Sequence, residues 1–148
     1  MAEIILILSI IFAAIFNAVM DKLQFHFRNS IFPDTDWVNP SRSWNNKYKK
    51  NKIKTYLLST IFAWTTDLFH MAKFLWMRFL LFTVIMFKFA DFKPIVNSVL
   101  NIQIDWVFYT FIYIMLWVIY SFTFELFFGI IFNKKGIKGY IEKYFKSK

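Results

Sequence analysis

The chain contains no cysteine, and among its 148 residues there are only three glycines and three prolines. Without cysteine the chain cannot form disulfides, thiolate metal sites or a cysteine nucleophile. A calcium loop starting at Asp34 and Asp36 is also excluded, because the central Gly and the closing Glu of such a loop are missing. Acidic residues are few: 9 Asp and Glu stand against 18 Lys and Arg, and the net charge is +9.

Apolar and aromatic residues are what the chain has in excess. Hydrophobic residues make up 58% and aromatic residues 23%, whereas soluble domains average about 45–50% apolar residues. This excess indicates a chain embedded in a bilayer. The basic residues lie between and after the apolar runs. We therefore interpret the positive charge as a determinant of membrane topology, and nucleic-acid binding is disfavoured.

Three apolar runs are long enough to predict transmembrane helices. The first covers about residues 4–20 and is not preceded by the basic residues of a signal peptide, so we expect it to be retained. The second lies within residues 56–89, which as one helix would measure about 51 Å against a hydrocarbon core of about 30 Å. Such a helix must therefore extend beyond the membrane, tilt within it, or break into an interfacial segment and a spanning segment. The third covers about residues 106–132.

The connecting segments predict how these helices are oriented. The 21–55 loop contains eight Lys and Arg and the tail at 133–148 contains six, whereas the 90–104 loop contains one. By the positive-inside rule the N-terminus lies outside and the C-terminus in the cytoplasm of a bacterial inner membrane type. The fold class is a single all-α membrane domain over residues 1–148, with a basic cytoplasmic loop and an amphipathic C-terminal helix.

A basic cluster, KYKKNKIK at residues 47–54, directly precedes the second apolar run. Such clusters are attracted to anionic lipid. We expect contacts with lipid headgroups from Trp44, Lys47, Lys49, Lys50, Lys52 and Lys54.

The stretch TTDLFHMAK, residues 65–73, places charge inside the second apolar run. On a helical wheel Asp67, His70, Lys73 and Arg78 lie on one side, opposite a broad apolar face. A lipid-facing Asp costs about 2.5–3.5 kcal/mol. We therefore expect this polar stripe to face protein or trapped water.

Five ionisable residues are predicted to gather at the cytoplasmic end of the bundle. They are Asp21, His26, Asp67, His70 and Glu125. One interpretation is a metal site for zinc, iron or manganese, because Asp67 and His70 share a helix face three residues apart. Another is interhelical pairing, with Asp67 bound to Lys73 or Arg78 and Glu125 to a basic group. A proton or ion relay is the third.

The polar elements also resemble a known pattern. They read MDKLQFHF, NPSRSWNNKYK and TTDLFHMAK, and together they are similar to a family of small uncharacterised integral membrane proteins of bacteria and their phages. The resemblance runs from about residue 17 to residue 74. It implies no activity, but it implies that these three elements form one unit. The matching positions are Asp21, Gln24, His26, Trp44, Asn46, Lys47, Tyr48, Asp67 and His70.

Three functions are compatible with these features. The first is a non-enzymatic component of a membrane assembly that contacts anionic lipid and associates with itself or with a larger complex. The second is a membrane-embedded, metal-dependent enzyme acting on a lipid or lipid-linked substrate. The third is a subunit of a proton-linked channel or transporter, for which three spans in one chain would require oligomers.

Overall fold

The structure is a computed structural model that describes residues 1–43, 45–46, 62–94, 96, 105–136 and 138. Within these ranges the chain is helical, and a single bridge between Ser30 and Asn133 is the only β pairing. Three helices are long and apolar enough to cross a membrane. They are α1 (Ala2–Phe25), α4 (Leu68–Phe87) and α6 (Asp105–Glu125), the last continued by a π-helix at Leu126–Ile131. The predicted all-α class with three spans is confirmed.

Shorter elements connect these helices. A 3₁₀ turn at Phe27–Asn29 follows α1, and the short helix α2 occupies Pro40–Ser43. A second 3₁₀ turn, Ala63–Thr65, precedes α4. The predicted amphipathic helix in the C-terminal tail falls almost entirely outside the described residues.

The helix boundaries differ from the predicted ones at two places. The first helix does not end at residue 20 but continues to Phe25, so that Asp21 and Lys22 are helical. The apolar segment 56–89 breaks before residue 68, where Asp67 is extended and separates a 3₁₀ turn from α4. The remaining 20 residues of α4 measure about 30 Å, which matches the hydrocarbon thickness.

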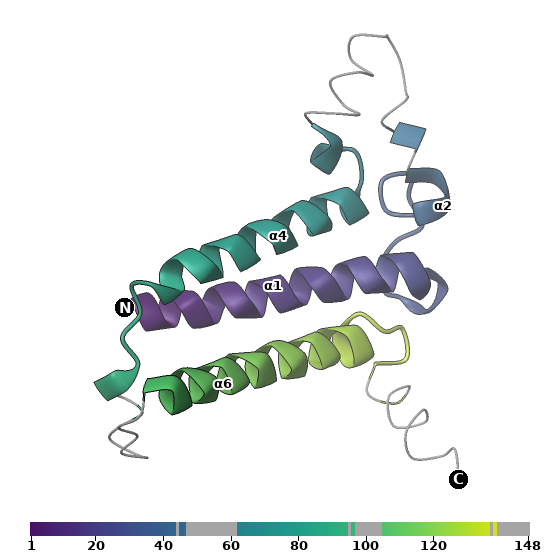
Figure 1. Cartoon of the computed structure of the whole chain (residues 1–148). Coiled ribbons are helices and arrows are strands. Elements are labelled where there is room, and N and C mark those ends of the chain that lie inside the picture. The colour runs from purple at the N-terminus through teal and green to yellow at the C-terminus, as the bar shows by residue number, and fades with distance from the viewer. Residues whose placement is uncertain (44, 47–61, 95, 97–104, 137, 139–148) are drawn as a thin grey trace.

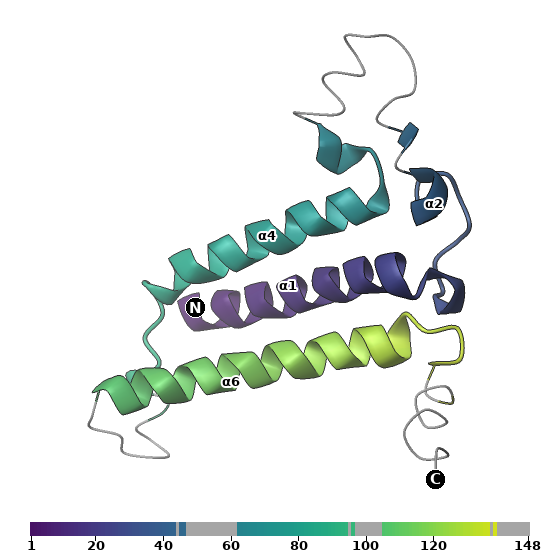
Figure 2. The ribbon, with the colours of Figure 1, turned by 45° about the vertical axis from the view of Figure 1, so that its right-hand side comes forward.

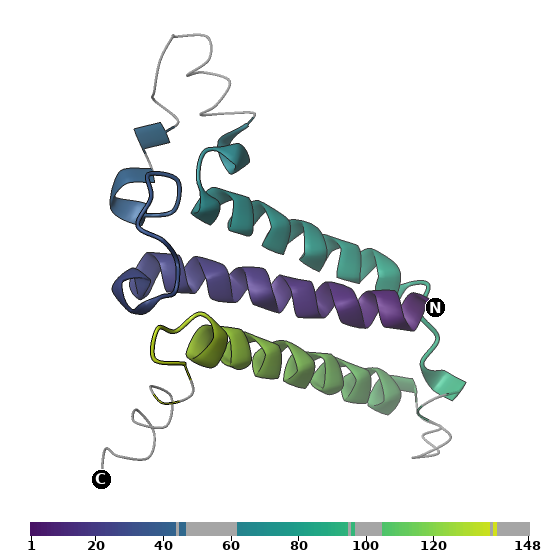
Figure 3. The ribbon, with the colours of Figure 1, turned by 180° about the vertical axis from the view of Figure 1, so that it is seen from behind.

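Helix α1 lies between α4 and α6 in every view (Figures 1, 2 and 3). The chain runs antiparallel from α1 to α4 and returns parallel to α1 in α6. In the most apolar stretch of α1, 39% of the residues are buried, whereas the corresponding stretches of α4 and of α6 with its π-helix have 11% buried. The central helix is therefore covered by its neighbours, whereas α4 and α6 leave most of their surface uncovered.

Small residues allow α1 and α4 to pack closely. Ala13, Ala14 and Ala18 of α1 are fully buried, as is typical of helix contacts in membranes. Close by, the hydroxyls of Ser9 in α1 and Thr83 in α4 form a buried hydrogen bond of 2.8 Å. This bond fixes the register of the two helices, because each hydroxyl has one partner across the interface.

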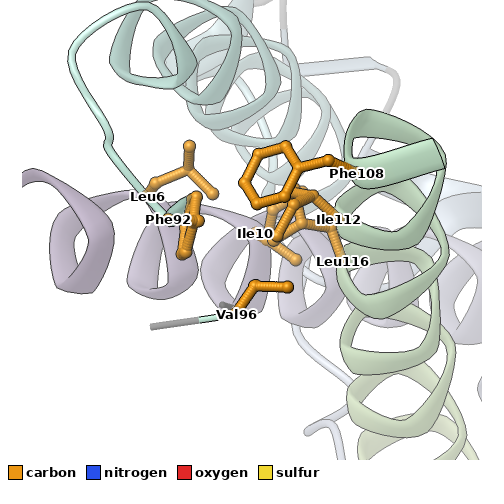
Figure 4. Packing of buried hydrophobic residues seen from close by; sticks show 7 residues of the cluster. All are labelled: Leu6, Ile10, Phe92, Val96, Phe108, Ile112 and Leu116. Atoms are coloured by element: carbon orange, nitrogen blue, oxygen red, sulfur yellow. The ribbon is translucent and has the colours of Figure 1, made fainter. Parts of the chain in front are cut away.

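Near the N-terminus of α1, an apolar cluster joins α1, α6 and the segment that follows α4 (Figure 4). Its buried members are Leu6, Ile10, Phe92, Val96, Phe108, Ile112 and Leu116. Beside it, Lys93 donates a 2.9 Å hydrogen bond to Asp105, and this bond raises the pKa of Lys93. These contacts hold the connection between α4 and α6 against the N-terminal half of α1.

Candidate functional site at the start of α4

Asp67 is the N-cap of α4. Its backbone is extended, with φ −160° and ψ 165°, and its Oδ1 accepts the backbone N–H of His70 at 2.9 Å. An N-cap side chain satisfies one of the amides that have no partner within the first turn, and an anion at this end is favoured by the helix dipole. The helix therefore begins at Leu68 because Asp67 caps it there.

The second carboxylate oxygen of Asp67 is also occupied. Oδ2 lies 3.1 Å from the Thr66 hydroxyl, which donates to it, and 2.7 Å from Nδ1 of His70. The Asp67 residue is only 2% exposed, whereas the His70 side chain is 33% exposed. When the carboxylate is ionised it can only accept hydrogen bonds, and Nδ1 of His70 is then the donor in this contact. Asp67 thereby fixes the orientation of the imidazole.

A loop folds over the start of α4, and we call residues 34–43 together with Asn46 the capping loop. The carbonyl of Trp37 accepts the N–H of Leu68 at 3.0 Å. The side-chain amide of Asn46 donates to the carbonyls of Asp36 and Thr66, at 2.9 and 3.0 Å. The capping loop thus satisfies backbone groups on both sides of Asp67 and binds the two segments to each other.

An internal ion pair network stabilises the capping loop itself. Arg42 contacts the carboxylates of Asp34 and Asp36 at 2.7 and 3.1 Å. Asn39 donates to Asp34 at 2.6 Å and accepts the N–H of Ser41 at 2.9 Å. These groups are exposed, so each pair contributes little to stability by itself, but together they hold the turn that presents Trp37 to α4.

Beneath the capping loop, an apolar cluster anchors this region to α1. Val38 of the loop is buried against residues of α1 and α4. The other buried members are Val19, Met20, Leu23 and Ala72. The capping loop, the start of α4 and the C-terminal third of α1 therefore form one packed unit.

The structure brings together only two of the five residues predicted to form a metal site. Asp67 and His70 are in contact, but among the described residues no three His, Cys, Asp or Glu side chains are placed to hold a metal ion. His26 is exposed and packs edge-on against the Phe128 ring, with centroids 5.3 Å apart. Asp21 is half-buried on α1, and Glu125 is exposed at the end of α6. The five predicted residues therefore do not form one ligand group among the described residues.

The predicted pairing of Asp67 with Lys73 or Arg78 is also corrected. Asp67 pairs with His70 instead, and both cations are exposed on α4. The guanidinium of Arg78 lies over the Phe74 ring, 4.9 Å from its centroid. Within the described part of the chain, the Glu125 side chain forms no hydrogen bond or ion pair. The predicted headgroup residues Trp44, Lys47, Lys49, Lys50, Lys52 and Lys54 lie outside the described residues.

A buried cation that the sequence analysis did not single out lies at the same end of the bundle. Lys22 of α1 is 3% exposed, and its Nζ donates to the carbonyl of Phe128 at 2.7 Å. The ammonium also lies 4.4 Å from the centroid of the Phe128 ring. A cation is favoured beside the free carbonyls that end a helix. No signal in the sequence singles out this lysine, because the carbonyl that it contacts belongs to a different helix.

Backbone contacts complete the link between the ends of α1 and α6. The N–H of Ile31 donates to the carbonyl of Phe132 at 3.1 Å, and the N–H of Lys134 to that of Asn29 at 2.9 Å. These contacts fix the chain after α1 against the chain after α6. Together with the Lys22 contact, they place the end of α6 level with the end of α1.

No known protein family, curated protein or solved structure matches the chain. The resemblance to small bacterial and phage membrane proteins therefore stays a prediction. Asn46, Asp67 and His70, which carry part of that resemblance, do lie within one connected unit.

Replacing Asp67 tests its role as a cap. We expect Asp67→Ala to lower the free energy of unfolding by about 1–2 kcal/mol, because it removes an N-cap. Asp67→Asn should retain most of the stability, since Asn is an equally good N-cap. Unfolding in mixed detergent micelles measures both variants. If Asn were as damaging as Ala, the carboxylate charge and not the cap would be the essential feature.

Replacing Lys22 tests the contact at the end of α6. Lys22→Met keeps the length of the side chain but leaves the Phe128 carbonyl without its donor, which should cost about 1–3 kcal/mol. Hydrogen exchange of the amides of residues 128–134 should accelerate. Lys138→Met is the matched control, because it removes the same charge from an exposed position. Equal effects of the two variants would contradict the role of Lys22.

Proposed function

We propose that this chain is a small polytopic membrane protein that acts as an interaction component of a membrane assembly. Its N-terminus would lie outside and its C-terminus in the cytoplasm of a bacterial inner membrane. In this orientation the capping loop and the Asp67–His70 pair would lie at the cytoplasmic surface. There the capping loop would contact water, which would solvate its exposed ion pairs.

The observation that carries the proposal is the uncovered surface of α4 and α6. Large apolar side chains are exposed there, including Val84 at 70% on α4 and Phe122 at 69% on α6. Lipid alone would cover such a surface well. Arg78 and Glu125 are exposed on the same two helices, however, and for a charge near the middle of the span, as Arg78 is, facing lipid costs about 2.5–3.5 kcal/mol. A protein partner that supplies counter-charges would remove this cost.

The Asp67–His70 pair is part of the scaffold in this proposal. Both oxygens of the carboxylate are occupied by hydrogen bonds that define the start of α4. The pair therefore orders the surface to which a partner would bind, and it does not need to react with a substrate.

Photocrosslinking would test the proposal with two neighbouring positions. Ile85 lies on the side of α4 that carries Arg78, whereas Val84 lines a groove on the other side. We expect a photoreactive residue at Ile85 to give crosslinked protein of higher mass in native membranes, and one at Val84 to give much less. Identical products from both positions, or lipid adducts alone, would contradict an assembly formed through this surface.

Anionic lipid is the second proposed ligand, on the basis of the charge in residues 47–54. We expect the purified protein to retain phosphatidylglycerol in preference to phosphatidylcholine when both are offered in mixed micelles. Each Lys near an anionic surface contributes about 1 kcal/mol, so replacing Lys47, Lys49, Lys50, Lys52 and Lys54 by Gln should abolish the preference. Native mass spectrometry counts the bound lipids. A preference unchanged in this variant would exclude the cluster as the lipid site.

A further inference from the structure

Arg78 and Glu125 are two opposite charges on the outer surface of the bundle. Arg78 is ten residues into α4, about 15 Å from the helix start and therefore near the middle of the span. Glu125 is the last residue of the α-helical part of α6, and the apolar π-helix follows it. Neither side chain has a counter-ion within the described part of the chain, although the Arg78 guanidinium rests on the Phe74 ring.

Both charges lie on the same side of the three-helix layer. A groove of about 560 Å³ runs along the other side, between α4 and α6, and Ile10 of α1 also lines it. At 3.6 residues per turn, Arg78 points about 170° away from the groove-lining residues of α4, and Glu125 about 130° away from those of α6. The side opposite the groove therefore carries a cation at one edge and an anion at the other.

The two charges also lie at similar depths. The Phe79 ring stacks on Phe12 and Phe16 of α1, with centroids 5.1 and 5.8 Å apart, which places Arg78 level with this part of α1. Lys22 contacts Phe128, and Glu125 lies three residues earlier in a helix parallel to α1, level with about Val19. The difference in depth is about 6–8 Å along the helix axis.

The direction of helical side chains reduces this difference. Side chains tilt toward the N-terminus of their own helix. On α4 this tilt carries the Arg78 guanidinium toward the helix start, which is the level of Glu125. On α6, which runs in the opposite direction, it carries the Glu125 carboxylate toward the level of Arg78. The charged ends of the two side chains are therefore closer in depth than their backbones.

From this arrangement we infer that two copies of the chain associate about a two-fold axis along the membrane normal, with Arg78 of each copy paired to Glu125 of the other. Such an axis places α4 of one copy against α6 of its partner, because the layer order α4, α1, α6 is reversed by the rotation. Both ion pairs then form at once, as an isologous interface requires. The groove side stays exposed to lipid. The inference deepens the proposed function by naming a second copy as the partner.

Charge complementarity within one chain favours a second copy over an unrelated protein. An unrelated partner would have to supply an acid for Arg78 and a base for Glu125 at matching depths. A second copy supplies both without any further requirement. Ionisable groups in membranes usually pair with one another, and here the pair is already encoded on opposite edges of one surface.

Charge reversal tests this pairing. Arg78→Glu and Glu125→Arg should each be monomeric, because the first variant would oppose two acids and the second two bases. We expect the dissociation constant of the dimer to rise at least about tenfold for each variant, because the loss of one modest interaction changes it by about this factor. The double variant carrying both reversals should dimerise again. Energy transfer between fluorophores on cysteines introduced into this Cys-free chain, reconstituted in liposomes, measures the dimer.

A mixture of the two single variants is the sharpest arm of the experiment. Arg78→Glu and Glu125→Arg, each monomeric alone, should form a mixed dimer in which both ion pairs are restored. This recovery also shows that both variants are folded. Lys88→Glu serves as the matched control for Arg78→Glu, because it reverses the charge of a cation at the C-cap of the same helix and should leave the dimer intact.

Two results would overturn the inference. One is a wild-type chain that stays monomeric in liposomes at high protein density. The other is a dimer that survives both single reversals. If crosslinking at Ile85 nevertheless captures a different protein, the proposed function stands while the two-fold dimer is rejected. If Ile85 captures no protein and the chain is monomeric, both proposals fail.

Discussion

The hydrogen bond from the backbone of His70 to the Asp67 carboxylate determines where the second long helix begins, and most of the structure depends on that position. The apolar segment at residues 56–89 is too long for one span, and this cap lies within it. Starting α4 at Leu68 brings Thr83 level with Ser9 and Phe79 level with Phe12 and Phe16. A helix that started one residue later or earlier would rotate these contacts by about 100° and separate them.

The end of α6 is stabilised by a charge of the opposite sign. An anion, Asp67, caps free N–H groups at the start of one helix, and a cation, Lys22, meets a free carbonyl near the end of another. Both lie at the same end of the bundle and are buried. Because both groups are buried away from water, the chain must supply the partners itself. The Trp37 carbonyl and the Asn46 amide extend this principle to the backbone around Asp67.

The all-α class and the three spans could be predicted from apolar runs and basic loops, because span length and the positive-inside rule are strong constraints. The site was only partly predictable. The contact between Asp67 and His70 followed from their spacing, which brings the residues together on a helix face or at a helix start alike. The expected grouping of this pair with Asp21, His26 and Glu125 was based on their similar depth in the membrane. Depth alone does not specify which side of a helix a residue occupies. Lys22 was missed because a lysine at a helix end is ordinarily solvated.

Polar residues inside apolar segments of this chain fall into two groups with different meanings. Ser9, Thr83 and Asp67 find partners within the chain, are buried, and account for their own presence by holding the helices together. Arg78 and Glu125 are exposed on the outer helices, so contacts within the chain do not account for them. Composition alone cannot separate the two groups, since both appear as interruptions of an apolar run. Burial separates them, and the exposed group is the basis of the proposed association with a second copy of the chain.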